Sequence, residues 1–193
     1  TMYRDNPFHN FEHASHVTMS VTKLLSRVVT TDDEQAGGSG FTNALDSDAL
    51  TKFAATFSAL IHDVDHTGLP NARLVEEETP VAIMYDRKSV AEKNSIAIAW
   101  EFLLRPEFCE LRACIGELER FHDLVTDAVM ATDIVDKELK EERNARWDTV
   151  FRESAHQAGD TDQLKASIVL DHMMQAADVS HTMQHWHIYR KWN

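Results

Sequence analysis

Basic residues, glycine, proline and cysteine are all scarce in this chain of 193 residues. Its 19 Lys and Arg are outnumbered by 32 Asp and Glu, so the formal net charge is −13. This charge argues against nucleic acid or an anionic membrane surface as the main partner. If the substrate is an anion, the chain needs a local positive charge to hold it, and a bound metal ion would supply one.

The chain also lacks a CxxC motif and any membrane-spanning or signal segment. The two cysteines, Cys109 and Cys114, form no CxxC motif, which favours a reducing, intracellular compartment. The chain has no run of 18 apolar residues and no signal peptide, so this segment predicts no direct membrane contact. If the full-length protein is anchored, we expect this chain on the cytoplasmic face of the membrane.

Apolar residues recur at helical spacing along most of the chain, and only six glycines and four prolines interrupt them. The periodicity predicts helices over residues 17–28, 50–61, 90–104, 121–135, 136–151 and 161–179. No segment alternates as a strand does, and no internal repeat is visible. The sequence therefore predicts an all-α fold, with one compact multi-helix domain over residues 1–193.

Capping residues and breakers set the expected limits of these helices. Asp46 or Ser47 is expected to cap the second helix, and Asp160 or Thr161 the last one. The stretch Thr30–Asp48 is rich in Gly, Ser and acids, which predicts a loop. Because the chain starts just before a motif and stops inside an amphipathic stretch, we expect a partial domain, truncated at both ends.

Histidine and aspartate gather in two motifs whose spacing suits a helix. In HNFEHASHV, His9 and His13 are four residues apart and would lie on one face. In HDVDH, His62 and His66 would share a face in the same way, with Asp63 about 100° round the helix. These ionisable groups follow an apolar helix and would be costly to bury without partners. Imidazole and carboxylate are common ligands of zinc and similar metals, so the pattern favours a divalent metal site.

A third motif, QAADVSH, places Asp178 at the edge of the apolar face of the last predicted helix, near its end. The helix dipole disfavours a negative charge at that position, and a cation would offset the cost. Asp178 is therefore a further candidate ligand.

The motifs NPFHNFEHASHV, HDVDHTGLPN, MATD and AADVSH occur in this order. Together they closely resemble the catalytic domain of class I cyclic-nucleotide phosphodiesterases, which belong to the HD-type metal phosphohydrolases. The resemblance runs from about Tyr3 to the end of the chain. It implies the all-helical HD-type fold, and it implies hydrolysis of 3′,5′-cyclic nucleotides, cAMP or cGMP, to nucleoside 5′-monophosphates in cyclic-nucleotide signalling.

The resemblance also implies a role for each matching residue. The first metal ion, zinc in the family, would have four ligands: His13, His62, Asp63 and Asp178. Asp63 would bridge to a second ion, Mg²⁺ or Mn²⁺. That ion would otherwise be held through water by three residues: His66, Glu92 and Thr132. His9 would be the general acid, and Glu92 would hold its ring in the right tautomer.

A hydroxide that bridges the two ions would attack phosphorus opposite the ribose O3′, and His9 would protonate that leaving oxygen. The residues expected to contact the substrate are His9, Asp63, Asp178 and His181. The metal ions would solve the charge problem of an acidic protein that binds an anion.

The chain departs from the family pattern at several positions. Phe8 stands where the family commonly has Tyr, and Thr67 where it has Pro. Asn94 and Ser95 stand near the place of a His pair, and His181 lies in SHT where many members have SNP. None of these changes removes a predicted ligand or the acid. The family's purine-binding glutamine would lie past the end of the chain, so the preference for cAMP or cGMP stays open.

Several alternatives also stay open. His66, Glu92 and Thr132 could have packing or capping roles, Asp133 could serve either purpose, and we interpret His16 as structural. Another HD-type phosphohydrolase, acting on acyclic nucleotides or phosphomonoesters, would explain HD and Asp178 but not the upstream HNxxH. A non-catalytic cyclic-nucleotide sensor is the second rival. Fused regulatory, cyclase or membrane domains and the oligomeric state are not fixed by the sequence.

Overall fold

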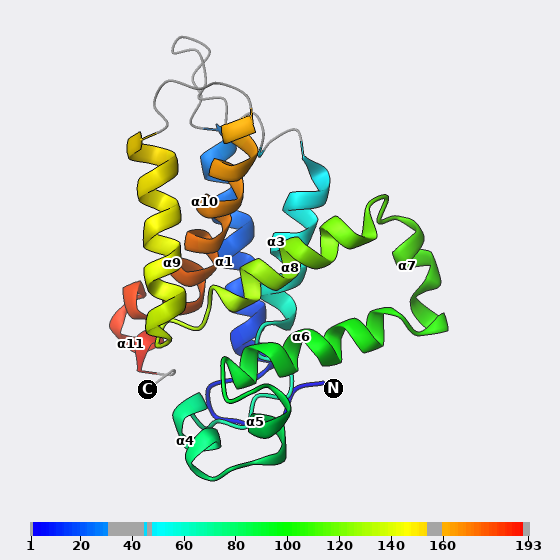
Figure 1. The fold of residues 1–193 in the computed structure, drawn as a ribbon, viewed down its shortest axis with the longest axis vertical. Helices are drawn as coiled ribbons and strands as arrows, with labels where there is room; N and C mark the ends of the chain where they lie inside the picture. The colour runs from blue at the N-terminus through cyan, green and yellow to red at the C-terminus, as the bar shows by residue number, and fades with distance from the viewer. Residues whose placement is uncertain (1, 31–44, 46–47, 154–159, 191–193) are drawn as a thin grey trace.

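The computed structural model describes residues 2–30, 45, 48–153 and 160–190, and every regular element within them is helical (Figure 1). The longer helices are α1 (Phe11–Thr30), α3 (Ala49–Ile61), α6 (Val90–Leu103), α8 (Leu118–Met130), α9 (Lys137–Asp148) and α10 (Asp160–Asp178). Short helices are α4 (Asn71–Glu76), α5 (Pro80–Met84), η1 (Pro106–Phe108), α7 (Cys109–Ala113), the π-helical turn η2 (Thr149–Glu153), η3 (Val179–Met183) and α11 (Trp186–Tyr189). The predicted all-α fold is confirmed.

Helix α3 lies at the centre of the fold. One apolar cluster joins it to α1 and α10, with Val21 and Met174 fully buried. A second cluster joins α3 to α6 and α8 around Phe121, which is also fully buried. Helices α1, α3, α9 and α10 follow the long axis, and α6 and α8 cross it (Figure 1). The start of α1 and the ends of α3 and α10 meet at the lower end of these long helices, above α4 and α5 (Figure 1).

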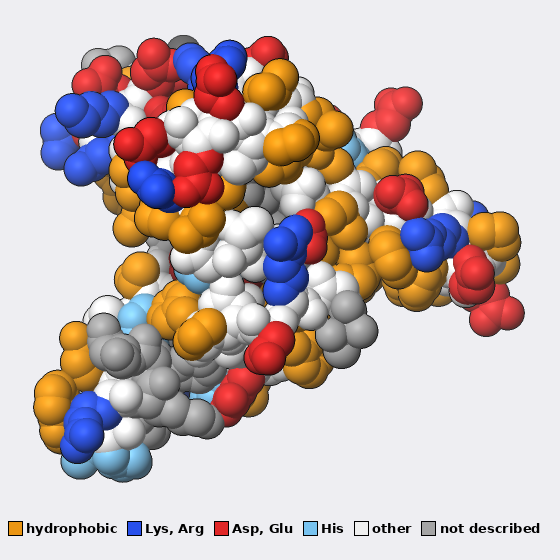
Figure 2. Space-filling model, turned by 90° about the horizontal axis from the view of Figure 1, so that it is seen from below, with side chains coloured by type: hydrophobic (Ala, Val, Ile, Leu, Met, Phe, Trp, Pro, Cys, Tyr) orange, Lys and Arg blue, Asp and Glu red, His pale blue; other side chains and the backbone are white. Residues whose placement is uncertain are grey.

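Seen from this end, the surface is hollowed between two lobes, and histidine side chains are visible within the hollow (Figure 2). Charged side chains are dense on one of the lobes (Figure 2). Within the described residues, no helix combines the length and the apolar character that crossing a membrane requires.

Two helix limits differ from the predicted ones because a side chain accepts backbone N–H groups at that point. Asp48, rather than Asp46 or Ser47, caps α3, because its Oδ1 accepts the N–H groups of the first turn. Asp46 and Ser47 lie outside the described residues, as do the side chains of Asp160 and Thr161 and most of the predicted loop.

Helix α8 ends at Met130, five residues before the predicted end at Val135. Asp133 Oδ1 accepts the N–H groups of Val135 and Asp136 at 3.2 and 3.1 Å. These bonds form a side-chain turn, and the helix does not continue through it. Thr132 therefore lies between the end of α8 and this turn, and not on a helix face.

A buried acid on α10 should make the stability of the fold depend on pH. Asp171 is 5% exposed, and Arg146 Nη1 lies 3.7 Å from its Oδ2. Burial raises the pKa of Asp171 to about 7, although Arg146 opposes the shift. The folded chain then binds this proton more tightly than the unfolded chain, so the free energy of unfolding falls as pH rises from about 4 to 7.

We therefore expect Asp171→Asn to stabilise the fold more at pH 8 than at pH 5, by on the order of 3 kcal/mol. Thermal unfolding at both pH values measures this difference. Asp123→Asn, which alters an exposed acid on α8, is the matched control and should change neither value. An equal gain at pH 5 and pH 8 would show that Asp171 does not titrate in this range.

Candidate metal centre

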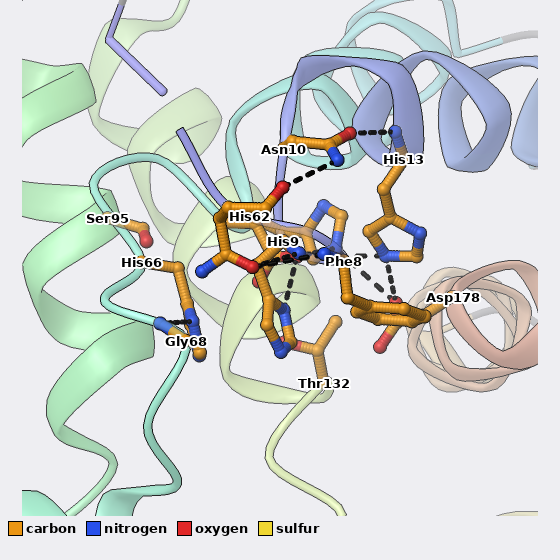
Figure 3. A network of polar contacts seen from close by, with 12 residues as sticks. Phe8, His9, Asn10, His13, His62, His66, Gly68, Ser95, Thr132 and Asp178 are labelled. Atoms are coloured by element: carbon orange, nitrogen blue, oxygen red, sulfur yellow. Dashed lines mark hydrogen bonds and ion pairs between the residues drawn. The ribbon is translucent and has the colours of Figure 1, made fainter. Parts of the chain in front are cut away.

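The start of α1, the end of α3 and the end of α10 bring three predicted ligands together (Figure 3). His13 Nε2 lies 2.9 Å from Asp178 Oδ1, and His62 Nε2 lies 3.4 Å from the same oxygen. One ligand atom from each of these three residues lies within 4.8 Å of the other two. This spacing allows one cation to contact all three side chains.

Asp63 lies between this first group and a second one. Its Oδ2 is 3.4 Å from His62 Nε2 and 3.6 Å from His13 Nε2. The same oxygen is 2.9 Å from His9 Nδ1. His9, Asp63 and His66 form the second group, and their ligand atoms also lie within 4.8 Å of one another. A single carboxylate thus faces both groups, as a residue that bridges two cations must.

The two histidine motifs are less helical than their spacing predicted. Helix α1 begins at Phe11, so His9 precedes it, and α3 ends at Ile61, so HDVDH forms a turn. Asp65 has a φ of +59°, a left-handed conformation that no helix continues. His62 and His66 therefore do not share a helix face, and each belongs to a different group.

The first group fits a divalent cation because it leaves a buried nitrogen without a partner. His62 is 3% exposed, and its Nδ1 donates to the Ala59 carbonyl oxygen at 3.0 Å. In the neutral ring Nε2 then carries the lone pair, and this buried atom has no hydrogen-bond partner. Such an orphaned nitrogen is costly inside a protein, and a metal ion would satisfy it.

The charges around the first group also favour a cation. Burial by itself lowers the pKa of His62, but Asp63 and Asp178 outweigh it and raise that pKa to about 9. Burial raises the pKa of Asp178, yet the hydrogen bond with His13 and the nearby ring of His62 hold that pKa well below its usual range. Burial similarly opposes the charges of His62 and His9, which keep the pKa of Asp63 low. Two ionised carboxylates therefore share a nearly closed pocket, where a divalent ion would balance them.

His66 in the second group suits a contact through water. The Gly68 N–H donates to His66 Nδ1 at 3.0 Å, so the neutral ring carries its proton on Nε2. Burial, together with the charge of His9, lowers the pKa of His66 to about 4, and the ring is neutral at physiological pH. This ring can donate to a water molecule, but it offers no lone pair to an ion.

Asp63 fixes the ring of His9. An ionised carboxylate only accepts, so His9 Nδ1 donates to Asp63 Oδ2, and Nε2 is the nitrogen that can deliver a proton elsewhere. The His9 ring also stacks on His66, with the centroids 3.6 Å apart. We expected Glu92 to hold this ring, but the Glu92 Oε2 instead accepts from Asn71 Nδ2 at 2.8 Å.

Glu92 and Thr132 lie outside both ligand groups of the described residues. Thr132 Oγ1 donates to the Val129 carbonyl at 2.7 Å, and Figure 3 shows its side chain beside the site. Burial raises the pKa of Glu92, and the charges of Asp133 and Asp63 add to this effect. The charge of Asp63 thus acts on Glu92, although Glu92 belongs to neither ligand group.

Phe8 and His181 border the first group. The Phe8 ring centroid is 4.5 Å from that of His13 and 5.2 Å from that of His181. A small cleft of about 80 Å³ is lined by His13, Asp178 and His181, and also by His16. His16 is exposed and belongs to neither ligand group. His181, which is expected to contact the substrate, therefore lies beside the predicted ligands.

Asn6, which the sequence analysis did not single out, holds the segment that carries His9. It is buried, and its Oδ1 accepts the His9 N–H at 3.1 Å. Gly68 packs against it with a φ of +85°, and a Cβ there would approach the Asn6 amide nitrogen to 2.6 Å. Asn10 caps α1, because its Oδ1 accepts the His13 N–H at 3.0 Å. Two asparagines just before a helix are a capping signal that sequence alone could have supplied.

Asn94 and Ser95 of α6 have partners away from both ligand groups. Asn94 Nδ2 donates to Asp65 Oδ2 at 3.2 Å, and Ser95 Oγ donates to the Val64 carbonyl at 2.8 Å. Asp65 also forms an ion pair with Arg4, at 2.6 Å. These residues tie α6 and the N-terminal segment to the HDVDH turn.

Comparisons with known proteins agree on one family. The model of the family described as 3′5′-cyclic nucleotide phosphodiesterase matches residues 8–193. A Caenorhabditis elegans protein, "Probable 3′,5′-cyclic-AMP phosphodiesterase pde-4", is 32% identical over 99% of the chain. A mouse protein, "Dual specificity calcium/calmodulin-dependent 3′,5′-cyclic nucleotide phosphodiesterase 1C", is 30% identical over 97% of it.

Among solved structures, the phosphodiesterase domain of the RhoPDE fusion protein from the choanoflagellate Salpingoeca rosetta superposes with a TM-score of 0.77. Its sequence is 24% identical, so this likeness concerns the fold. The alignment covers 99% of the present chain and 55% of that domain. The chain spans 27% of the length of the C. elegans relative and 24% of the mouse relative. That residues 1–193 form a partial domain stays a prediction.

Proposed function

The chain belongs to the 3′5′-cyclic nucleotide phosphodiesterase family, and on this premise we propose that it hydrolyses cAMP or cGMP to the nucleoside 5′-monophosphate at the candidate metal centre. The observation that carries the proposal is the convergence of His13 and His62 with Asp178 around Asp63, from helices far apart in the sequence. The contact of His9 with the same carboxylate supports it.

We assign Zn²⁺ to the first group and Mg²⁺ or Mn²⁺ to the second. Two imidazoles with carboxylates are a donor set that zinc prefers, whereas Mg²⁺ binds one or two carboxylates and keeps several waters. When bound, the two ions would polarise the phosphate oxygens and lower the pKa of the attacking water. They would also hold the anionic substrate on a chain whose net charge is −13.

The side chains of this chain supply the remaining chemistry. The protonated ring of His9, held at Nδ1 by Asp63, gives its Nε2 proton to the ribose O3′ as the P–O3′ bond breaks. His66, Glu92 and Thr132 would orient the waters of the second ion. His181 borders the cleft and contacts the base.

A direct assay tests the proposed function. The chain, in the longest form that its open reading frame encodes, is incubated with cAMP and with cGMP in the presence of Zn²⁺ and Mg²⁺ or Mn²⁺. We expect 5′-AMP or 5′-GMP as the product, with complete loss of turnover after chelation and recovery on adding the metals back. Production of neither monophosphate would contradict the proposal.

A panel of substrates separates the rival functions in the same assay. Turnover of acyclic nucleotides or phosphomonoesters, with no activity on cyclic nucleotides, would favour another HD-type phosphohydrolase. Metal binding by elemental analysis without turnover of any substrate would favour a non-catalytic sensor. The predicted proton donor near the metal groups argues for cyclic-nucleotide hydrolysis over both rivals.

A further inference from the structure

We propose that Asn71 is a positioning residue that holds the Glu92 carboxylate toward the second ligand group, and that it thereby sets the affinity of the site for the second divalent ion. The inference rests on the proposed two-metal function. It concerns a residue that lies in neither ligand group and that contacts the acids Glu92 and Asp133.

The amide of Asn71 joins three segments. Its Nδ2 donates to Glu92 Oε2 at 2.8 Å and to Asp133 Oδ2 at 3.3 Å. Its Oδ1 accepts the N–H of Ala91, in the first turn of α6, at 2.9 Å. Asn71 itself begins α4, directly after the loop that carries His66. One side chain thus links this loop to the start of α6 and to the turn that follows α8.

Asp133 extends the same network to the backbone that precedes Glu92. Ser89 caps α6 in a left-handed conformation, with φ 45° and ψ 53°, which is uncommon for a residue other than glycine. The Ser89 Oγ donates to Asp133 Oδ2 at 2.8 Å, and both residues are buried. The opposite oxygen of Asp133 closes the turn that directly follows Thr132. Such strained backbone persists where several contacts fix it, and functional sites are common places for it.

The electrostatics explain why an amide is needed at this position. Glu92 and Asp133 are two acids that share one N–H₂ group, and each charge disfavours the other. Removing the donor would take a hydrogen bond from both carboxylates at once. Repulsion would then turn the Glu92 side chain away from Asp133, and its reach toward the second ion would change. A residue that orients a metal-site group in this way is typically worth 10–100-fold in metal affinity.

The test uses Asn71→Asp, which keeps an oxygen for the Ala91 N–H and replaces only the donor. Asn94→Asp is the matched control. Like Asn71, Asn94 donates its amide N–H to an acid, but that acid, Asp65, belongs to neither ligand group. Binding of Mn²⁺ to the zinc-loaded protein is measured by electron paramagnetic resonance without substrate. We expect Asn71→Asp to raise the Mn²⁺ dissociation constant at least about tenfold. Asn94→Asp should leave it within about twofold, with zinc content unchanged in both variants.

The proposal also predicts that the two substitutions are coupled. Combining Asn71→Asp with Glu92→Gln exchanges the amide and the carboxylate, so their hydrogen bond can still form and the pair can still pack. If Asn71 acts through Glu92, this double variant binds Mn²⁺ as weakly as Glu92→Gln alone. This comparison remains decisive if Asn71→Asp alone does not fold.

Two results would overturn the proposal: equal Mn²⁺ affinity in Asn71→Asp and Asn94→Asp, or a further tenfold loss when Asn71→Asp is added to Glu92→Gln. Recovery of the Asn71→Asp turnover rate at high Mn²⁺ would support it, since a general structural defect would not respond to the ion. Absence of cyclic-nucleotide turnover, with Mn²⁺ binding as expected, would overturn the proposed function and leave the role of Asn71 supported.

Discussion

Replacement of Asp63 by alanine will abolish hydrolysis of cyclic nucleotides and will remove both divalent ions together, because this carboxylate faces the two ligand groups at once. Its Oδ2 lies within 3.6 Å of a ring nitrogen of His13 and of His62, in the first group. The same oxygen lies 2.9 Å from Nδ1 of His9, in the second group. Loss of a residue that only orients a ligand costs about 10–100-fold in metal affinity or activity. Loss of a ligand shared by both groups should therefore lower kcat/KM by more than about 100-fold.

Elemental analysis of the dialysed protein, beside a turnover assay, measures both effects. The matched control is Asp65→Ala, two residues further along the same turn, where the carboxylate contacts Arg4 and Asn94 and neither ligand group. This control should keep its metal content and most of its activity. An Asp63→Ala protein that retains both ions but not its turnover would show that Asp63 is not a ligand.

The longer helices could be predicted because their apolar faces are long enough to set a period. The predicted helices over 90–104 and 161–179 correspond to α6 and α10 within a residue or two. The short helices α4 and α5 could not be predicted in this way, since each spans under two turns. Local contacts hold them instead, such as the Thr79 Oγ1 that accepts the Ala82 N–H at the start of α5.

The residues of the candidate site could be named from sequence, but their contacts could not. The family motifs supply the names, and the packing of α1, α3 and α10 brings His13 and Asp178 within 2.9 Å. Helical spacing wrongly placed His9 on a helix face, because Asn10 caps α1 after it. Spacing also gives no information on which acid holds the His9 ring, since that depends on side-chain conformations. The structure has Asp63 in this position and pairs Glu92 with Asn71.

The role of His9 as proton donor leads to the second large expected effect. Replacing His9 with asparagine keeps an N–H₂ group that can donate to Asp63, as Nδ1 of the ring does, but leaves no acid at the position of Nε2. Loss of a general acid typically costs 10²–10⁴-fold, so we expect a loss of about this size in kcat for cAMP or cGMP. The zinc content should not change, because the first group of His13, His62 and Asp178 is intact.

The leaving group provides the sharper measurement of this role. The ribose O3′ is a poor leaving group unless it is protonated, whereas p-nitrophenolate leaves without a proton. His9→Asn should therefore lose far less rate on a p-nitrophenyl phosphodiester than on a cyclic nucleotide, within about tenfold of the unaltered protein. Equal losses on both substrates would mean that His9 acts on the metal site or on binding. Loss of metal from His9→Asn would also contradict the role of proton donor. It would mean that His9 acts mainly by stacking on His66 and by contacting Asp63.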